Sequence, residues 1–283
     1  MKSLLTLALA LPSALGSPAL FPQADSAAAP PPAGHRIPTS YESAVMGRRI
    51  LALSKLADFS TTFPTSSSSS ESEDEATSLG RRPEGLAGLP INMMDYIAEC
   101  EDSGNPTVLA INIATTFRNA AAGSNVSVSL RWTPPYPPAH RIPLSLWGRL
   151  SEAIFGPGED SAPPDTVPYS AANLPRMSLI GYFEPIEPAG VPGLELAACF
   201  VAKHPDAKYW LPGNAIHKSS WARLVVTQVY WVGGFGDRAY IGWIPIEEWQ
   251  SVTKEEWSSI TLPGEKKGWR EWSAVEGSME PDL

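Results

Sequence analysis

Residues 219–236 read SSWARLVVTQVYWVGGFG, and this stretch decides the fold class. A long run of β-branched and aromatic residues without Pro or Gly predicts a strand that ends at Gly233. Both faces of this strand are largely apolar, so we expect it to be mostly buried. One face would carry Trp221, Arg223, Val225, Thr227, Val229 and Trp231, and the other Ala222, Leu224, Val226, Gln228, Tyr230 and Val232.

The glycines after this strand allow two interpretations. Gly234, Gly236 and Ala239 match the loose G-x-G-x-x-A form of the dinucleotide fingerprint, which needs a following helix to hold a phosphate. Here the glycines lead into RAYIGWI (238–244), which is typical of a strand. We therefore predict a hairpin turn in which Gly233, Gly234 and Gly236 supply positive φ angles.

The remaining patterns extend this hairpin to a mainly β, α+β domain with a few helices. The expected order is helix, two pairs of strands, a long excursion, a strand, a helix and a final pair of strands. This order favours one β-barrel over alternating βαβ units. The predicted strands are 58–64, 88–100, 106–114, 126–133, 176–186, 219–232 and 238–244. The predicted helices begin at 39, 115, 144, 194 and 245, and the one at 144 lies within the excursion.

The first helix has a clear start signal. Thr39 and Glu42 have the spacing of a capping box. A broad apolar stripe predicts that the helix packs on the barrel; it runs along Val45, Ile50, Leu53 and Leu56, with Met46 and Leu51 beside them. The basic pairs are interpreted as solvated surface; they are Arg48–Arg49, Arg81–Arg82 and Lys266–Lys267.

The N-terminus predicts entry into the secretory pathway. Lys2 and the short apolar run from Leu4 to Leu11 are typical of a signal peptide (1–16) with cleavage between Gly16 and Ser17. The run is too short to span a bilayer, and we expect no transmembrane segment. The rest of the chain divides into a flexible leader (17–38), a domain (39–262) with a disordered Ser/acidic insertion (64–86) and a Pro-rich excursion (133–170), and a tail (263–283).

That compartment affects two further features. Cys100 and Cys199 could form a disulfide in an oxidising lumen or could be buried free thiols, and their spacing leaves both open. Asn125 heads the sequon Asn-Val-Ser and is a candidate glycosylation site.

Charge and motif content exclude several functions. A net charge of −9 argues against a nucleic-acid partner. None of the four His lies in a metal-ligand arrangement, and no spacing of residues amounts to a catalytic set. We therefore expect no metal site and assign no catalytic residue.

Three segments together resemble the CREG family of secreted glycoproteins. These are ACFVAKHPDAKYW (198–210), the strand and glycines at 219–236, and IPIEEWQSV (244–252). The family features within them are His204, Pro205, Trp210, Trp221, Gly233 and Gly234.

The resemblance implies a split β-barrel of the pyridoxamine-phosphate-oxidase, FMN-binding type and a homodimer. Flavin-using relatives hold the FMN phosphate with basic and hydroxyl side chains, and Arg118 and Arg131 are the candidates here. A phosphate carries about two negative charges, so two scattered cations would hold it weakly.

The CREG family is regarded as having lost flavin chemistry, so we expect no cofactor. We expect a protein in the secretory or endolysosomal lumen, or secreted, that acts through protein contacts. The alternative is an FMN-dependent oxidoreductase. A third hypothesis is a binder of a small apolar or tetrapyrrole ligand with the excursion as its lid.

Overall fold

The computed structural model describes residues 36–65, 83–136, 154, 171–187, 190–214, 218–236, 238–267 and 269, all within the unit Pro31–Leu283. Several predicted segments lie wholly or largely outside these residues. They are the signal peptide with its cleavage site at Gly16 and Ser17, the leader, the centre of the insertion, most of the excursion and most of the tail.

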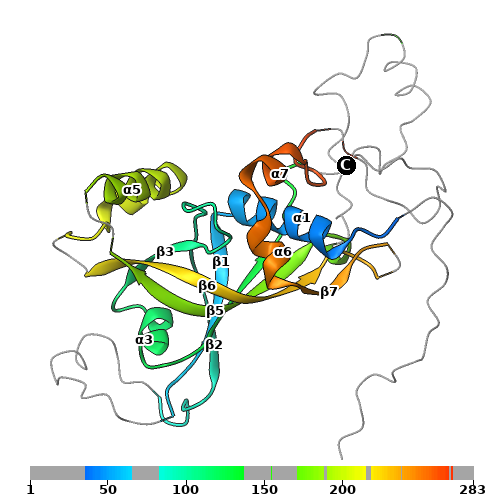
Figure 1. Ribbon diagram of the computed structural model, residues 1–283. Coiled ribbons are helices and arrows are strands. Elements are labelled where there is room, and N and C mark those ends of the chain that lie inside the picture. Colours follow the sequence, from blue (N-terminus) through cyan, green and yellow to red (C-terminus); the bar gives the residue numbers. More distant parts are fainter. Residues whose placement is uncertain are drawn as a thin grey trace, which may run out of the picture. The chain divides into compact units, whose positions relative to one another are not determined.

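The described residues form one antiparallel sheet with five α-helices, an α+β split barrel (Figure 1). The strands are β1 (Leu56–Thr62), β2 (Pro90–Tyr96), β3 (Thr107–Ile111), β4 (Val126–Arg131), β5 (Arg176–Ile186), β6 (Ser219–Val232) and β7 (Ile241–Ile244). The helices are α1 (Ser40–Leu53), α3 (Thr115–Ala121), α5 (Val191–Lys203), α6 (Ile246–Ser251) and α7 (Lys254–Ser259), with 3₁₀ turns at Ala171–Asn173 and Pro205–Tyr209.

The strand order β2-β1-β4-β5-β6-β3 closes on itself through a single bridge. Ala98, just after β2, exchanges two backbone hydrogen bonds with Thr107 of β3, at 3.0 and 2.7 Å. This bridge joins the two ends of the sheet and makes the barrel. The sequence patterns predicted the barrel class and the seven strands that build it.

The barrel is split along β6, whose one edge has two different partners. β3 pairs with Ser219–Arg223, while β7 pairs with Val229–Val232 of the same strand. Between them the loop after β2 fills the edge, because Val226 donates its N–H to Asn105 Oδ1 at 2.9 Å. The backbone polar groups of the split are thus satisfied by a loop instead of a strand.

A β-bulge in β6 overturns the predicted division of this strand into two faces. The register with β5 shifts between Ile180 and Gly181, which pair with Gln228 and Val226. The extra residue, Thr227, moves the core-facing positions by one. Leu224 and Val226 face the core before the bulge and Val229 and Trp231 after it, while Gln228 and Tyr230 are exposed.

Gly181 makes the bulge possible. A Cβ atom at this position would lie 1.9 Å from the carbonyl oxygen of Val225. No side chain fits against a backbone atom at that distance, so the strands can approach here only at glycine.

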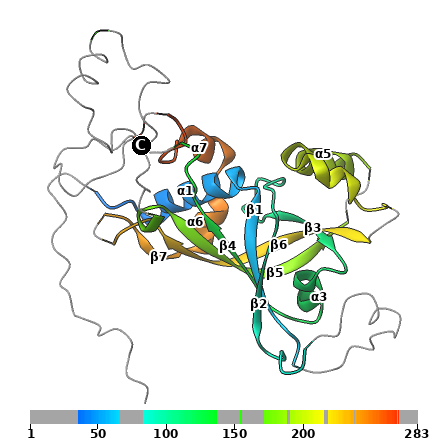
Figure 2. The same cartoon turned by 180° about the vertical axis from the view of Figure 1, so that it is seen from behind.

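The helices pack on two separate regions of the sheet. Figure 1 and the reverse view in Figure 2 show α1, α6 and α7 gathered over one end and α5 lying apart over β3. α1 begins with the predicted capping box, in which Glu42 N–H donates to Thr39 Oγ1. Its predicted stripe is wrong at Leu53 and Leu56, which are exposed; the buried face contains Ile50, Leu51 and the small residues that let α1 approach the sheet.

The β6–β7 connection is the predicted hairpin, but its geometry does not require glycine at each of the three glycine positions. Gly233 N–H donates to Tyr240 O at 3.0 Å and closes the loop. Of the three glycines, Gly234 alone has the predicted positive φ, at +151°, so the prediction is wrong for Gly233 and Gly236. Gly233 is required for another reason, because a Cβ there would lie 2.8 Å from Trp231 Nε1. Gly236 has neither constraint. The strand β7 follows, so these glycines do not open a helix.

Candidate functional site

An open cleft of about 550 Å³ lies beside α3, on the side of the barrel formed by β3, β5 and β6. Its walls are mostly apolar, with a few polar groups at the rim, as is usual for small-molecule sites. Its lining includes Asn112, Phe117, Arg118, Asn125, Tyr182 and Ser220.

Short-range contacts fix α3 against this cleft. Phe117 is buried, with its ring centroid 5.3 Å from that of Phe183 on β5. On the same turn, Asn119 Nδ2 donates to Thr61 Oγ1 of β1 at 3.1 Å. With these two side chains directed inward, Arg118 is left exposed along the cleft.

The structure does not bring the two predicted phosphate ligands together. Arg118 lines the cleft, and β4 begins beside it with Val126, which pairs with Gly181. Arg131 is exposed at the other end of β4, where it pairs with Arg176. Val126 and Arg131 are five residue steps apart along β4, and each step in a strand is about 3.3 Å long.

The cleft therefore fits a flavin phosphate poorly. Among the described residues that line it, Arg118 is the sole charged one, and a phosphate carries about two negative charges. Asn112, Ser124 and Ser220 add neutral hydrogen-bonding groups. This set suits a neutral polar ligand better than a dianion.

The sequon residue Asn125 lies at the same cleft. It is exposed and forms part of the lining, just before the first residue of β4. Ser127, which completes the sequon, is partly buried on β4.

Cys100 and Cys199 form a disulfide with their Cα atoms 5.9 Å apart. It ties α5 to the loop that follows β2, and these cysteines are 99 residues apart in the chain. A hydrophobic cluster beneath α5 completes this contact. It contains Ala98, Leu109, Leu196, Phe200, Ala207 and Trp221.

The family-signature residues of the C-terminal half fall into two groups. His204, Pro205, Trp210 and Trp221 belong to the region under α5, where Pro205 begins the 3₁₀ turn after the helix. His204 is buried and its Nε2 lies 3.0 Å from the carbonyl oxygen of Ile97. Gly233 and Gly234 lie in the β6–β7 hairpin. Both groups have structural contacts that explain them.

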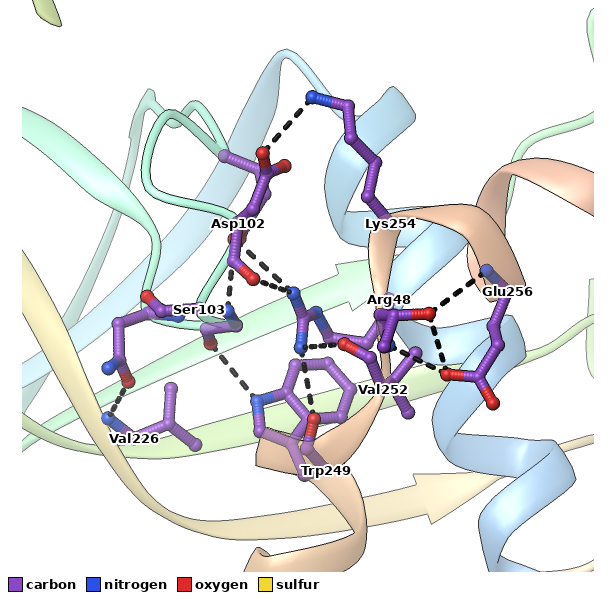
Figure 3. A network of polar contacts seen from close by, with 12 residues as sticks. Arg48, Asp102, Ser103, Val226, Trp249, Val252, Lys254 and Glu256 are labelled. Atoms are coloured by element: carbon purple, nitrogen blue, oxygen red, sulfur yellow. Dashed lines mark hydrogen bonds and ion pairs between the residues drawn. The ribbon is translucent and has the colours of Figure 1, made fainter.

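Arg48 is the residue that sequence reasoning misjudged most. It was predicted to be solvated, yet its side chain and that of Glu99 are 0% and 2% exposed, with a 3.5 Å ion pair between them. Arg48 also donates to the backbone oxygens of Trp249, Val252 and Asp102 at 3.0, 3.2 and 2.8 Å (Figure 3). One guanidinium thus joins α1, the α6 region and the loop in the split.

The surroundings of this pair are closely packed. Trp249 Nε1 donates to Gly104 O at 3.0 Å, and Gly104 has a φ of +77° that suits glycine. Burial raises the pKa of the Glu99 carboxyl, while the charge of Arg48 acts in the opposite direction. The signal for Arg48 was its spacing: with Ala44 and Leu51 it shares one face of α1 at i, i+4 and i+7.

Two further observations concern only the part of the chain that the structure describes. Within it, no group of three His, Cys, Asp or Glu side chains could hold a metal ion. Of the four His, His204 alone is described, since His35, His140 and His217 lie outside. None of the helices found there is long and apolar enough to cross a membrane.

A family model described as CREG, beta-barrel, matches residues 38–251, more than half of the chain. No curated protein matches the chain. The chain is similar to a heme-binding protein from Mycobacterium smegmatis, with 18% identity and a TM-score of 0.46, over 76% of this chain and 62% of that one. A protein of unknown function from Agrobacterium tumefaciens has 20% identity and a TM-score of 0.41, over 81% and 64%.

HutZ, the heme storage protein of Vibrio cholerae, has 14% identity and a TM-score of 0.38, over 67% of this chain and 92% of its own. This chain spans less than two thirds of the length of the Mycobacterium and Agrobacterium proteins.

Proposed function

This chain belongs to the CREG β-barrel family, and from that membership we propose that it is a secreted or lumenal glycoprotein that forms a homodimer and acts through protein contacts without catalysis. The observation that carries the proposal is an exposed aromatic surface on β6 and β7. It consists of Tyr230, Ile241 and Trp243, and is called the Tyr230–Trp243 surface below.

Strand alternation produces this surface. Ile244 of β7 is buried against the core under α1 and α6, so its neighbour Trp243 points the other way and is 55% exposed. Tyr230 is directly opposite Trp243 in the ladder, and their ring centroids are 5.1 Å apart. Aromatic side chains on a sheet face are typical of contact surfaces, where Tyr and Trp are enriched.

A second copy of the chain is the partner that we propose for this surface. A two-fold axis through it would place the same aromatic pair against itself, which is the usual form of a homodimer contact. Ser178 of β5, paired with Tyr230, adds a small neutral side chain beside the rings. The aromatic centre of the surface is therefore uncharged, as dimer interfaces prefer, while the exposed Arg176, which pairs with Val232, lies at its edge.

Two observations support the compartment. A disulfide such as Cys100–Cys199 persists in oxidising compartments and is rare in the cytosol. Asn125 is exposed at the start of a strand, where a glycan can be attached without displacing the core. Both agree with the signal peptide predicted for residues 1–16.

Light scattering on the secreted protein tests the proposal. We expect twice the protomer mass for the native chain, and a shift towards the monomer for Trp243→Ser. Tyr209→Ser is the matched control, because Tyr209 is also a largely exposed aromatic residue, at 62%, but lies on the 3₁₀ turn after α5. A monomeric native protein, or a dimer that Trp243→Ser leaves intact, would refute the proposed surface.

An FMN-dependent oxidoreductase is the second candidate, and the size of the cleft favours it, although Arg118 supplies only one cation for the phosphate. Its volume lies in the range usual for ligand sites. An FMN-dependent oxidoreductase must absorb in the flavin band when purified and must release FMN on denaturation. Loss of the colour in Arg118→Ala would support it, whereas a colourless native protein would exclude it.

A further inference from the structure

Asn125 is held in a fixed position at the rim of the cleft. Ser124 Oγ donates to the carbonyl oxygen of Asn125 at 2.7 Å and accepts from the N–H of Thr62 at 2.8 Å. The backbone that would carry a glycan is thus tied to the end of β1. The first sugar could therefore move only by rotation about the side-chain bonds of Asn125 and about the glycosidic bond.

Tyr182 is a large side chain in the lining of the same cleft. The β4–β5 ladder ends at the pair Val126–Gly181, so one further residue on each strand brings Asn125 beside Tyr182. Val126 faces the core, and alternation turns Asn125 outward. Tyr182 is 49% exposed, and both residues line the cleft.

We propose that the first N-acetylglucosamine units on Asn125 lie on the Tyr182 ring and close the cleft. This inference rests on the glycoprotein part of the proposed function and names the occupant of the cleft. A pyranose ring has an apolar C–H face, which an aromatic face with its negative quadrupole attracts. The polar edge of the sugar then meets the neutral groups of Asn112 and Ser220 and the guanidinium side of Arg118.

The lining supports this occupant better than it supports an anion. The walls formed by Phe117, Phe183 and Trp221 are apolar, and three of the polar groups at the rim are uncharged. A covered Tyr182 also removes an exposed aromatic side chain from the surface of a secreted protein. A ligand of flavin size would have to displace a covalently attached sugar, whose effective concentration at the cleft is high.

The two ends of the outer sheet face would then have different roles. On β5, Ser178 lies opposite Tyr230, and Tyr182 is four residues further along. Four residues of strand correspond to about 13 Å. The glycan would therefore cover the cleft end and leave the Tyr230–Trp243 surface free for a second copy.

Hydroxyl-radical footprinting of the secreted full chain tests this arrangement at single residues. Four forms are compared: the native protein, the protein trimmed enzymatically to one sugar, the fully deglycosylated protein, and Ser127→Ala, which removes the sequon but keeps Asn125. We expect Tyr182 to be oxidised several-fold less in the native and trimmed forms than in the other two. Tyr209, exposed on another part of the molecule, is the internal standard.

Two controls separate the possible outcomes. Ser129→Ala changes an exposed serine of the same strand without touching the sequon and should behave as the native protein. If peptide masses show no glycan at Asn125, the glycoprotein part of the proposed function is wrong and this inference falls with it. If the glycan is present and Tyr182 is oxidised equally in all four forms, the inference alone is overturned and the proposed function stands.

Discussion

At the scale of single residues, Arg48 has the largest expected effect on stability. Removing the guanidinium in Arg48→Met leaves Glu99 buried without its cation and three backbone oxygens without their donor. Breaking a buried ion pair on one side costs about 3–5 kcal/mol, which urea unfolding would measure as a lower free energy of unfolding.

The neighbouring residue is the control. Arg49 pairs with Glu265 and is partly solvated, so Arg49→Met should cost only about 1 kcal/mol. Exchanging both buried partners, in Arg48→Met with Glu99→Leu, should recover part of the loss because no unpaired charge remains. Equal losses for Arg48→Met and Arg49→Met would show that the network does not stabilise the barrel.

His204 predicts a pH dependence whose sign follows from its surroundings. Burial lowers the pKa of the imidazole, although the hydrogen bond to the carbonyl oxygen of Ile97 raises it. The rings of Tyr96 and Phe200 pack on it, at centroid distances of 4.5 and 4.9 Å. The charged groups that act on it are Lys203, Asp206 and Lys55.

Below pH 6.5 the unfolded chain binds a proton at His204 that the folded protein does not yet bind. The free energy of unfolding therefore falls as the pH drops through this window towards the lower pKa of the folded state. Urea midpoints from about pH 7.5 to about pH 5 should decline less steeply in His204→Phe than in the native protein. Parallel pH profiles for the two proteins would contradict the prediction.

At the scale of elements, the disulfide decides how firmly α5 lies on the barrel. Cys199 is on α5 and Cys100 is on the loop after β2, so the bond closes a loop of 99 residues. We expect Cys100→Ser with Cys199→Ser to lose about 2–4 kcal/mol in urea unfolding. Hydrogen exchange should accelerate in α5 before it accelerates in β4 and β5, and uniform acceleration would argue that α5 is not a separate unit.

An element could be predicted where its structure follows from neighbouring residues, and could not where it depends on contacts with distant parts of the chain. β4 and β5 follow regular alternation with the core on one side, and the bounds predicted for β5 are those observed. The faces of β6 could not be predicted in this way, because the bulge depends on the contact between Gly181 and the carbonyl oxygen of Val225 on another strand. The burial of Arg48 likewise needs Glu99 and three backbone oxygens that lie far from it in the chain.

The arrangement of the candidate site likewise depends on contacts between distant parts of the chain. Arg118 and Asn125 were both singled out from the sequence, but only folding shows that they line one cleft and that Arg131 does not. Tyr182 carried no sequence signal beyond its place in an alternating strand. Folding leaves it 49% exposed and places it in the lining of the cleft.

At the scale of the whole molecule, net charge sets how association responds to salt. Each copy carries −9, so two copies repel each other at long range. Tyr230, Ile241 and Trp243 are uncharged, so the centre of the proposed contact offers no ion pair to offset that repulsion. Raising the ionic strength from about 0.05 M to about 0.5 M shortens the range of the repulsion several-fold and should tighten the dimer, as sedimentation would measure. A dimer that weakens with salt would instead be held by opposite charges across its interface, and the aromatic surface would not be its centre.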